Sequence, residues 1–69
     1  MAPPFTVIGF EQRGGESFLA VSPLQSNRLA DISLLSKGDT QNGWQLSAME
    51  AGRAHFVLPN GKRHVLNIR

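Results

Sequence analysis

Turn-forming residues interrupt this sequence at short, regular intervals, and this spacing limits the possible folds more than any other feature. The turn signals stand at residues 14–15, 23–27, 37–43, 51–52 and 59–61. The segments between them have the length of β-strands and are short for α-helices. The pattern therefore predicts an all-β fold, a small six- to seven-stranded β-sandwich or rolled barrel of antiparallel strands.

The length of 69 residues allows one small domain. We expect residues 1–4 to be the stub of a proline-containing linker, because Pro3 and Pro4 cannot join a central strand. Residues 5–69 then form a single β domain. The chain has no cysteine, so disulfides and thiolate metal sites are excluded. No apolar run approaches the ~20 residues that span a bilayer.

The first hairpin combines segments 5–11 and 16–22 through a two-residue glycine turn. This turn predicts that Phe10 lies opposite Leu19 and Ile8 opposite Val21 on one face, and that Val7 points to the other. The first strand is therefore apolar on both faces. Such a strand is either sandwiched within its own domain or offered to a partner.

The later segments carry more local detail. Residues 28–35 are predicted as a strand, with a short helix as the alternative, because the segment also fits a 3.6-residue period. In segment 44–50, Trp44 and Leu46 share one side of the strand and Met49 falls on the opposite side unless a bulge shifts the register. We expect that bulge near Ser47 or Ala48. The last hairpin needs a three-residue loop at 59–61, because only that length aligns the apolar faces of its two strands.

The predicted core consists of the apolar residues on the inferred inner faces of these strands. They are Ile8, Phe10, Leu19, Val21, Ile32, Leu34, Trp44, Leu46, Phe56, Leu58, Leu66 and Ile68.

The charge is unevenly distributed along the chain. Residues 1–52 carry three basic and five acidic side chains, or −2, whereas residues 53–69 carry four basic side chains and no acid, or +4. Those four residues are Arg53, Lys62, Arg63 and Arg69. They suggest an alternative function, a small β-barrel that binds nucleic acid through its basic C-terminal hairpin, with Phe56 or Trp44 as a stacking surface. Against it, both aromatics fall on inferred core faces and the total charge of +2 is low.

The sequence contains no recognisable catalytic or metal-binding motif. His55 and His64 are predicted on opposite faces of the last hairpin, so they do not converge on a metal. No serine stands in a nucleophile elbow, and the glycines form neither a dinucleotide fingerprint nor a P-loop. We therefore expect no catalytic residues, no metal, no cofactor and no small-molecule substrate. A cytoplasmic SH3-like peptide binder is a further alternative, and it would need an exposed aromatic groove at Trp44.

Residues 5–69 resemble the periplasmic homology-region domain of the PilP and GspC family of inner-membrane proteins. The resemblance follows the order of short motifs along the chain. These are Phe5-Thr6-Val7-Ile8-Gly9-Phe10, Phe18-Leu19-Ala20-Val21, Gly38-Asp39, Gly43-Trp44-Gln45-Leu46 with Met49, Phe56-Val57-Leu58, Asn60-Gly61-Lys62 and Val65-Leu66-Asn67-Ile68. The Gly38-Asp39 pair followed by the segment from Gly43 is the most recognisable element.

The resemblance implies a non-enzymatic coupling role in a type IV pilus or a type II secretion machine. Such a domain docks the inner-membrane platform proteins onto the N-terminal periplasmic domain of the outer-membrane secretin. It implies a location in the periplasm, with an inner-membrane anchor in a segment absent from this chain. We expect the partner to contact Thr6, Val7, Ile8 and Gly9, with Arg28 and Asp31 on a neighbouring strand as a polar rim. Burial of this strand in its own sandwich is the competing expectation.

Overall fold

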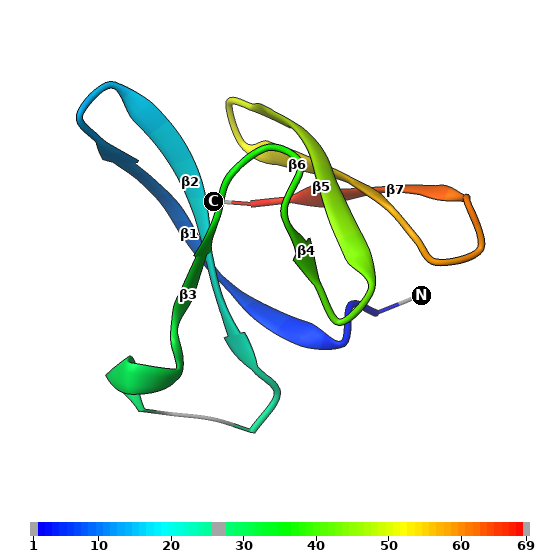
Figure 1. Ribbon diagram of the computed structural model, residues 1–69, viewed down its shortest axis with the longest axis horizontal. Coiled ribbons are helices and arrows are strands. Elements are labelled where there is room, and N and C mark those ends of the chain that lie inside the picture. The colour runs from blue at the N-terminus through cyan, green and yellow to red at the C-terminus, as the bar shows by residue number, and fades with distance from the viewer. Residues whose placement is uncertain (1, 26–27, 69) are drawn as a thin grey trace.

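The computed structural model describes residues 2–25 and 28–68 and confirms the predicted all-β class (Figure 1). Within these ranges the chain forms seven strands and one turn of 3-10 helix, η1. The strands are β1 (Phe5–Arg13), β2 (Glu16–Pro23), β3 (Ser33–Leu35), β4 (Thr40–Gln41), β5 (Trp44–Glu50), β6 (Arg53–Val57) and β7 (Arg63–Asn67), and η1 is Leu29–Asp31.

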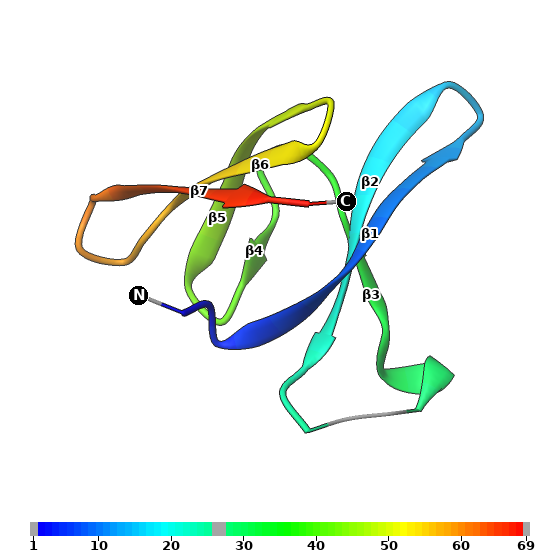
Figure 2. The ribbon, with the colours of Figure 1, turned by 180° about the vertical axis from the view of Figure 1, so that it is seen from behind.

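The strands form two antiparallel sheets that follow chain order. The first sheet has the order β1-β2-β3 and the second the order β4-β5-β6-β7. Within each sheet, strands that follow one another in sequence pair, which is the simplest connectivity available to antiparallel strands. Figures 1 and 2 show the long β1–β2 hairpin lying beside the second sheet. The C-terminal end of β7 points toward this hairpin.

A bulge in β1 changes one half of the predicted first hairpin. Near the glycine turn the prediction is confirmed, since Phe10 pairs with Leu19. Beyond it the prediction is wrong, because Val7 rather than Ile8 pairs with Val21 and Ile8 becomes the extra residue of the bulge. A glycine inside a strand is a known sign of such a bulge, and Gly9 supplies it.

Residues 28–35 contain both of the structures that the sequence left open. The segment begins with η1, in which the amide of Ile32 donates to the carbonyl of Leu29 (3.1 Å), and it continues as the three-residue strand β3. The stretch 37–43, predicted as a turn, also holds the two-residue strand β4. Asn42 and Gly43 join β4 to β5 with positive φ angles of 52° and 82°, which suits a type I′ hairpin turn.

The β5 bulge and the register of the last hairpin in the second sheet follow the prediction. The β5 bulge lies at Ser47, between the Leu46–Phe56 pair and the Ala48–His55 pair. The Ser47 hydroxyl donates to the carbonyl of His55 (3.1 Å), which stabilises the irregular backbone. The bulge turns Met49 toward the core, as expected.

The β6–β7 turn has the predicted three residues. The amide of Gly61 donates to the carbonyl of Leu58 (2.9 Å), and the amide of Leu58 donates to the carbonyl of Lys62 (2.8 Å). Gly61 takes a φ of 85°, the left-handed conformation that ends such a turn. The resulting register places Phe56 opposite His64, so the inner faces of the two strands align.

Three aromatic rings from both sheets form the centre of the core. The ring centroid of Phe5 lies 5.7 Å from that of Trp44 and 5.5 Å from that of Phe56, and the last two are 5.7 Å apart. These distances suit tilted and edge-to-face aromatic contacts. The buried cluster comprises Phe5, Leu19, Val21, Leu35, Trp44, Leu46, Ala54, Phe56 and Leu58.

The predicted core is wrong mainly in the first sheet. Ile8 and Phe10 are 54% and 37% exposed, and Phe5, which the prediction omitted, is buried. Leu35 is buried where Leu34 was expected, because β3 presents Leu35 opposite Leu19. Three further predicted members, Ile32, Leu66 and Ile68, are half-buried, and the last two pack against the core.

Candidate functional site

The outer face of the β1-β2-β3 sheet carries an apolar patch between polar ends, which hold Thr6 and Ser22 on one side and Glu11, Arg13 and Glu16 on the other. Gly9 pairs with Ala20, and Ala20 pairs with Leu34, so these three residues form one row across the sheet. Leu19 and Val21, on either side of Ala20 in β2, point into the core. Because side chains alternate along a strand, the row of Ala20 faces away from the core.

Larger apolar side chains extend this row. Phe18 lies two residues from Ala20 on the same face of β2, and both Phe18 and Leu34 are half-buried. Ile8 follows Val7, which packs against the core, and its side chain is 54% exposed at the bulge. We call Ile8, Phe18, Ala20 and Leu34 the outer apolar face. A sheet with one solvated face ordinarily carries polar residues there, so this face resembles a surface that a partner covers.

The β1 strand also has an open edge beside this face. In the sheets formed by the described residues, β1 pairs with β2 alone. Its other edge therefore presents backbone N–H and C=O groups along a strand of nine residues. An unpaired edge of this length can accept an additional strand from another chain.

Some of the predicted contact residues of β1 are exposed, as partner contact requires, and others are buried in the domain's own sandwich. Thr6 and Ile8 are exposed, whereas Val7 is half-buried against the domain's own core and Gly9 is half-buried in the bulge. Phe5 is fully inside the domain. The strand therefore uses one face for its own sandwich and presents the other outward.

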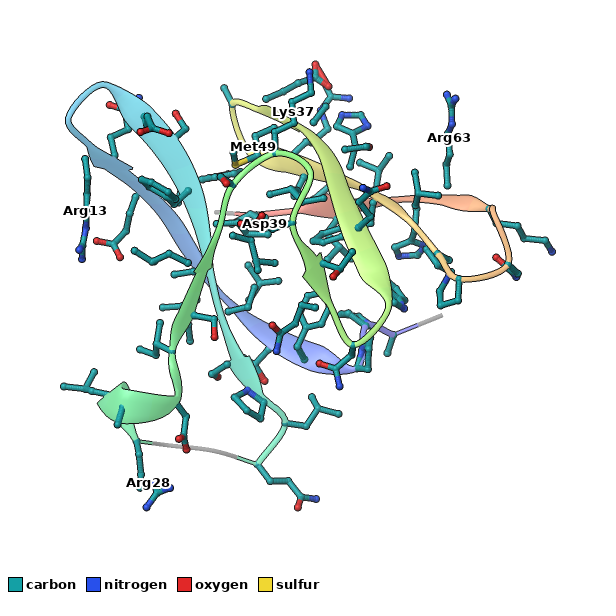
Figure 3. All side chains as sticks on the ribbon, viewed as in Figure 1. Arg13, Arg28, Lys37, Asp39, Met49 and Arg63 are labelled. Atoms are coloured by element: carbon teal, nitrogen blue, oxygen red, sulfur yellow. The ribbon has the colours of Figure 1, made fainter. Side chains whose placement is uncertain are left out.

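Arg28 and Asp31 do not lie on a strand beside β1, and this part of the prediction is wrong. Arg28 precedes η1 and Asp31 ends it, and β3 pairs with β2 on the side away from β1. The guanidinium Nε of Arg28 lies 3.4 Å from Oδ2 of Asp31. Figure 3 shows Arg28 beside η1 at the far end of the first sheet. A short helix before β3 displaced both side chains from the predicted position.

The basic residues of the last hairpin are spread over it. Arg53, Lys62 and Arg63 are exposed, but Arg53 pairs with Asn67 at one end of β6–β7 while Arg63 pairs with Val57 at the other. Four residues of strand separate these ends, or about 13 Å. Arg69, the fourth predicted residue, lies outside the described residues.

The aromatic residues proposed for stacking are inaccessible. Trp44 is 4% exposed and Phe56 is fully buried. Neither ring can therefore stack on a base, and Trp44 cannot line an open peptide groove of the SH3 type. The surface of the basic hairpin thus offers charge without the aromatic platform that single-stranded nucleic acid binding uses.

The two histidines lie on opposite faces of the second sheet, as predicted. His64 packs its ring edge-on against Trp44, with centroids 5.4 Å apart, whereas His55 Nε2 contacts the Glu50 carboxylate on the outer face. Across residues 2–25 and 28–68, no three side chains of the His, Cys, Asp and Glu types converge as metal ligands would. The most distinctive surface of the described chain is therefore apolar.

The part of the chain that the structure describes has no helix with the length and apolar character needed to cross a membrane. Comparisons of the chain with models of protein families, with curated proteins and with solved structures found no match. Function is therefore inferred from the chain's own residues and surfaces.

Proposed function

We propose that this domain is a non-enzymatic docking module of a type IV pilus or a type II secretion machine. In this role it couples the inner-membrane platform to the N-terminal periplasmic domain of the outer-membrane secretin. The outer apolar face, with Ile8 54% exposed on its edge strand β1, is the observation that carries the docking role. The sequence resemblance to the PilP and GspC family suggests the partner.

The physical mechanism combines a sheet face with a sheet edge. Burial of Ile8, Phe18 and Leu34 by a partner removes apolar surface from water, which provides the driving force. The free edge of β1 provides backbone hydrogen bonds that orient the partner. A domain of this size offers a small contact, about 1,000 Å² in total, and we expect binding in the micromolar range.

The location belongs to the same proposal. Docking on a secretin places the domain in the periplasm, held to the inner membrane by a segment outside this chain. Small β domains suit such a role, because their function requires a complementary surface and no enclosed pocket.

A titration of the isotope-labelled domain with a secretin N-terminal domain tests the proposal. At about 100 μM partner, a micromolar complex is nearly saturated. We expect amide shifts at Thr6, Ile8 and Gly9, together with Phe18 and Leu34. Shifts confined to the second sheet, or none, would contradict the proposed surface.

A matched pair of variants makes this test specific. Ile8→Ser removes the most exposed side chain of the outer apolar face, and we expect the affinity to fall by about tenfold, as for one central apolar contact. Val65→Ser is the control, since Val65 is 44% exposed on the other sheet. Equal losses of affinity in both variants would argue against a role for the outer apolar face.

The nucleic-acid alternative makes a separate prediction. Affinity for an oligonucleotide would fall steeply with salt and would disappear in the double variant Lys62→Ala, Arg63→Ala. We expect neither effect, because the basic residues are dispersed and the aromatic rings of Trp44 and Phe56 are buried. Salt-dependent oligonucleotide binding that the double variant abolishes would replace the docking proposal.

A further inference from the structure

Two hairpin turns of the second sheet carry the same dipeptide, asparagine followed by glycine. Asn42-Gly43 joins β4 to β5, and Asn60-Gly61 lies in the loop between β6 and β7 (Figure 1). Both asparagines are exposed. Asparagine is a chemically labile residue, and a glycine after it hinders attack on its side chain least, because glycine has no Cβ. The same chemistry is therefore available in two different turns.

The reaction open to such a dipeptide is deamidation. Hydroxide removes the proton of the glycine amide, and the amide nitrogen then attacks Cγ of the asparagine. The new N–C bond closes a cyclic succinimide, the Cγ–Nδ2 bond breaks, and the leaving nitrogen takes a proton from water and departs as ammonia, which restores the hydroxide. Water then opens the succinimide at either carbonyl, and the product is aspartate or isoaspartate. The reaction therefore requires a glycine amide proton that hydroxide can reach.

The β6–β7 turn holds both reacting groups in hydrogen bonds. The amide of Gly61 donates to the carbonyl of Leu58 (2.9 Å). The amide of Lys62 donates to Oδ1 of Asn60 (3.0 Å), which fixes the asparagine side chain. The turn also closes a hairpin whose strands have five residues each. Attack at Asn60 therefore requires the loss of a hydrogen bond at the attacking nitrogen and a change in the side-chain position.

The β4–β5 turn lacks these restraints. Across residues 2–25 and 28–68, no hydrogen bond engages the amide of Gly43 or the side chain of Asn42. Both residues are exposed, and β4 is an edge strand of only two residues. Short pairings at an edge open locally at low cost in free energy. The turn can therefore leave its left-handed conformation and bring Asn42 Cγ to the glycine nitrogen.

We infer that Asn42 is a deamidation site of the folded chain and that the β6–β7 turn protects Asn60. The dipeptides are identical, so the difference between them is made by the hydrogen bonds of their turns. The inference goes beyond the proposed function, because Asn42 belongs to the second sheet and not to the outer apolar face.

The two products of deamidation have different consequences for the hairpin. Aspartate before glycine suits the same type I′ turn and adds one negative charge. Isoaspartate adds a methylene to the backbone of a two-residue turn, directly before Trp44, which is buried in the core. Because turn length sets the register of a hairpin, we expect isoaspartate to disrupt the pairing of β4 with β5 and aspartate to preserve it.

Peptide-mapping mass spectrometry of the folded chain, incubated at mildly alkaline pH, tests the inference. We expect Asn42 to deamidate at least about tenfold faster than Asn60, a ratio that corresponds to about one hydrogen bond held closed. Similar rates at the two sites, or a faster rate at Asn60, would overturn the inference. The chain unfolded in urea is the matched control, and there we expect similar rates. A slow Asn60 in urea would assign the difference to local sequence and would also overturn the inference.

Amide hydrogen exchange provides an independent measurement. Base-catalysed exchange removes the same glycine amide proton that must leave before deamidation. We expect the amide of Gly43 to exchange at least about tenfold faster than that of Gly61. Equal protection of the two amides would remove the physical basis of the inference.

A pair of variants separates the two sites. Asn42→Asp retains a turn-forming residue but has no side-chain amide to lose, so we expect the ammonia released by the folded chain to fall at least about fivefold. Asn60→Asp is the matched control and should leave ammonia release unchanged. Thermal unfolding identifies any loss of structure in either variant. Unchanged ammonia release from folded Asn42→Asp would overturn the assignment, and where a variant unfolds, the exchange measurement on the unmodified chain decides.

Discussion

The two sheets of this domain share a core but have very different outer faces. The outer face of the three-stranded sheet carries an apolar patch of Ile8, Phe18, Ala20 and Leu34 between polar residues at its two ends. The outer face of the four-stranded sheet carries mainly polar and charged residues: Gln45, Glu50, Arg53, His55, Arg63 and Asn67, with Val57 and Val65 among them. None of these outer-face residues belongs to the buried cluster that the two sheets share.

The free edges of the two sheets are closer in character. The end strand β7 begins at Arg63, next to Lys62, and charges at an edge discourage pairing with another chain. The end strand β1 carries Glu11 and Arg13 near its hairpin turn and no charged residue from Phe5 to Phe10. The contrast teaches that packing of the core accounts for the inner faces of both sheets, whereas the apolar patch on the outer face of the first sheet is where the proposed partner would dock.

The largest expected effect tests whether the sheets share one core. Phe5→Ala and Phe56→Ala should each lower the free energy of unfolding by about 3–5 kcal/mol, because each ring is fully buried among the same aromatic neighbours. That loss is comparable to the whole stability of a domain this small. Urea denaturation followed by Trp44 fluorescence measures both. A loss below about 1 kcal/mol for Phe5→Ala would show that the first sheet packs independently.

The next effect contrasts the two outer faces directly. Ala20→Lys should destabilise the domain by about 1–3 kcal/mol, since Ala20 is 3% exposed and a long side chain must displace its neighbours. Ala48→Lys, at a half-buried position on the outer face of the other sheet, should cost under about 1 kcal/mol. Thermal unfolding of both variants checks the order. Equal losses would mean that the two outer faces are packed alike.

A smaller effect compares one hairpin turn from each sheet. Gly43 has a φ of 82°, and an added Cβ would lie 3.0 Å from Cγ of Pro59. Gly14 also has a positive φ, of 57°, but an added Cβ there meets no atom within 4 Å. Gly43→Ala should therefore cost about 2 kcal/mol and Gly14→Ala about 1 kcal/mol. Chemical denaturation that ranked them in the opposite order would contradict the packing of the β4–β5 turn on Pro59.

The smallest effect on stability is expected at the exposed apolar residues. Ile8→Ser and Val65→Ser should each change the free energy of unfolding by no more than about 0.5 kcal/mol, because both side chains are largely exposed. The variants should differ only in partner binding. A loss above about 1.5 kcal/mol for Ile8→Ser would show that Ile8 belongs to the domain's own packing. In that case the outer apolar face would not be free to dock.

Local sequence was sufficient to predict the β5 bulge and the β6–β7 register of the second sheet, although not its two-residue strand β4. The loop at 59–61 sets the β6–β7 register, and the mismatch at Met49 revealed the β5 bulge. Both features follow from alternation within a single hairpin, where turn length and side-chain period determine which residues share a face. The same reasoning predicted the all-β class, because the spacing of turns leaves room for little else.

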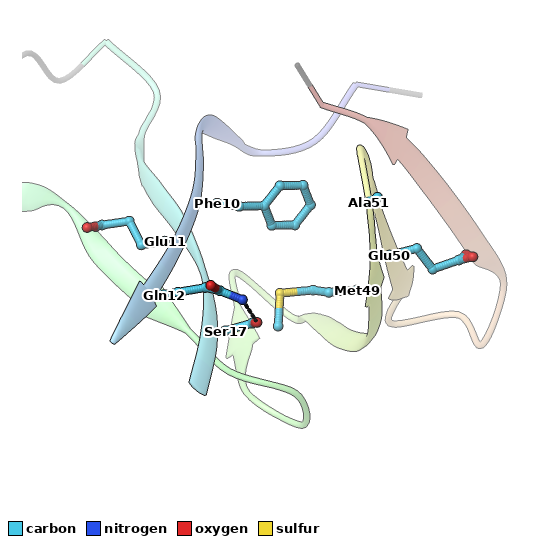
Figure 4. Close-up of a pocket in the computed structure, with 7 residues that line it drawn as sticks. All are labelled: Phe10, Glu11, Gln12, Ser17, Met49, Glu50 and Ala51. Carbon is cyan, nitrogen blue, oxygen red and sulfur yellow. Dashed lines mark hydrogen bonds between the residues drawn. The ribbon is translucent and has the colours of Figure 1, made fainter. Parts of the chain in front are cut away.

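Tertiary structure decided which surfaces were left for function. The β1 bulge removed Ile8 from the core and admitted Phe5, whose burial depends on Trp44 and Phe56 from the other sheet. A groove between the sheets is likewise lined by both Phe10 and Met49, which are far apart along the chain (Figure 4). Alternation within a strand predicts two faces but cannot say which face another sheet will cover. That choice is made only when the two sheets pack, since burial is a property of the assembled layers.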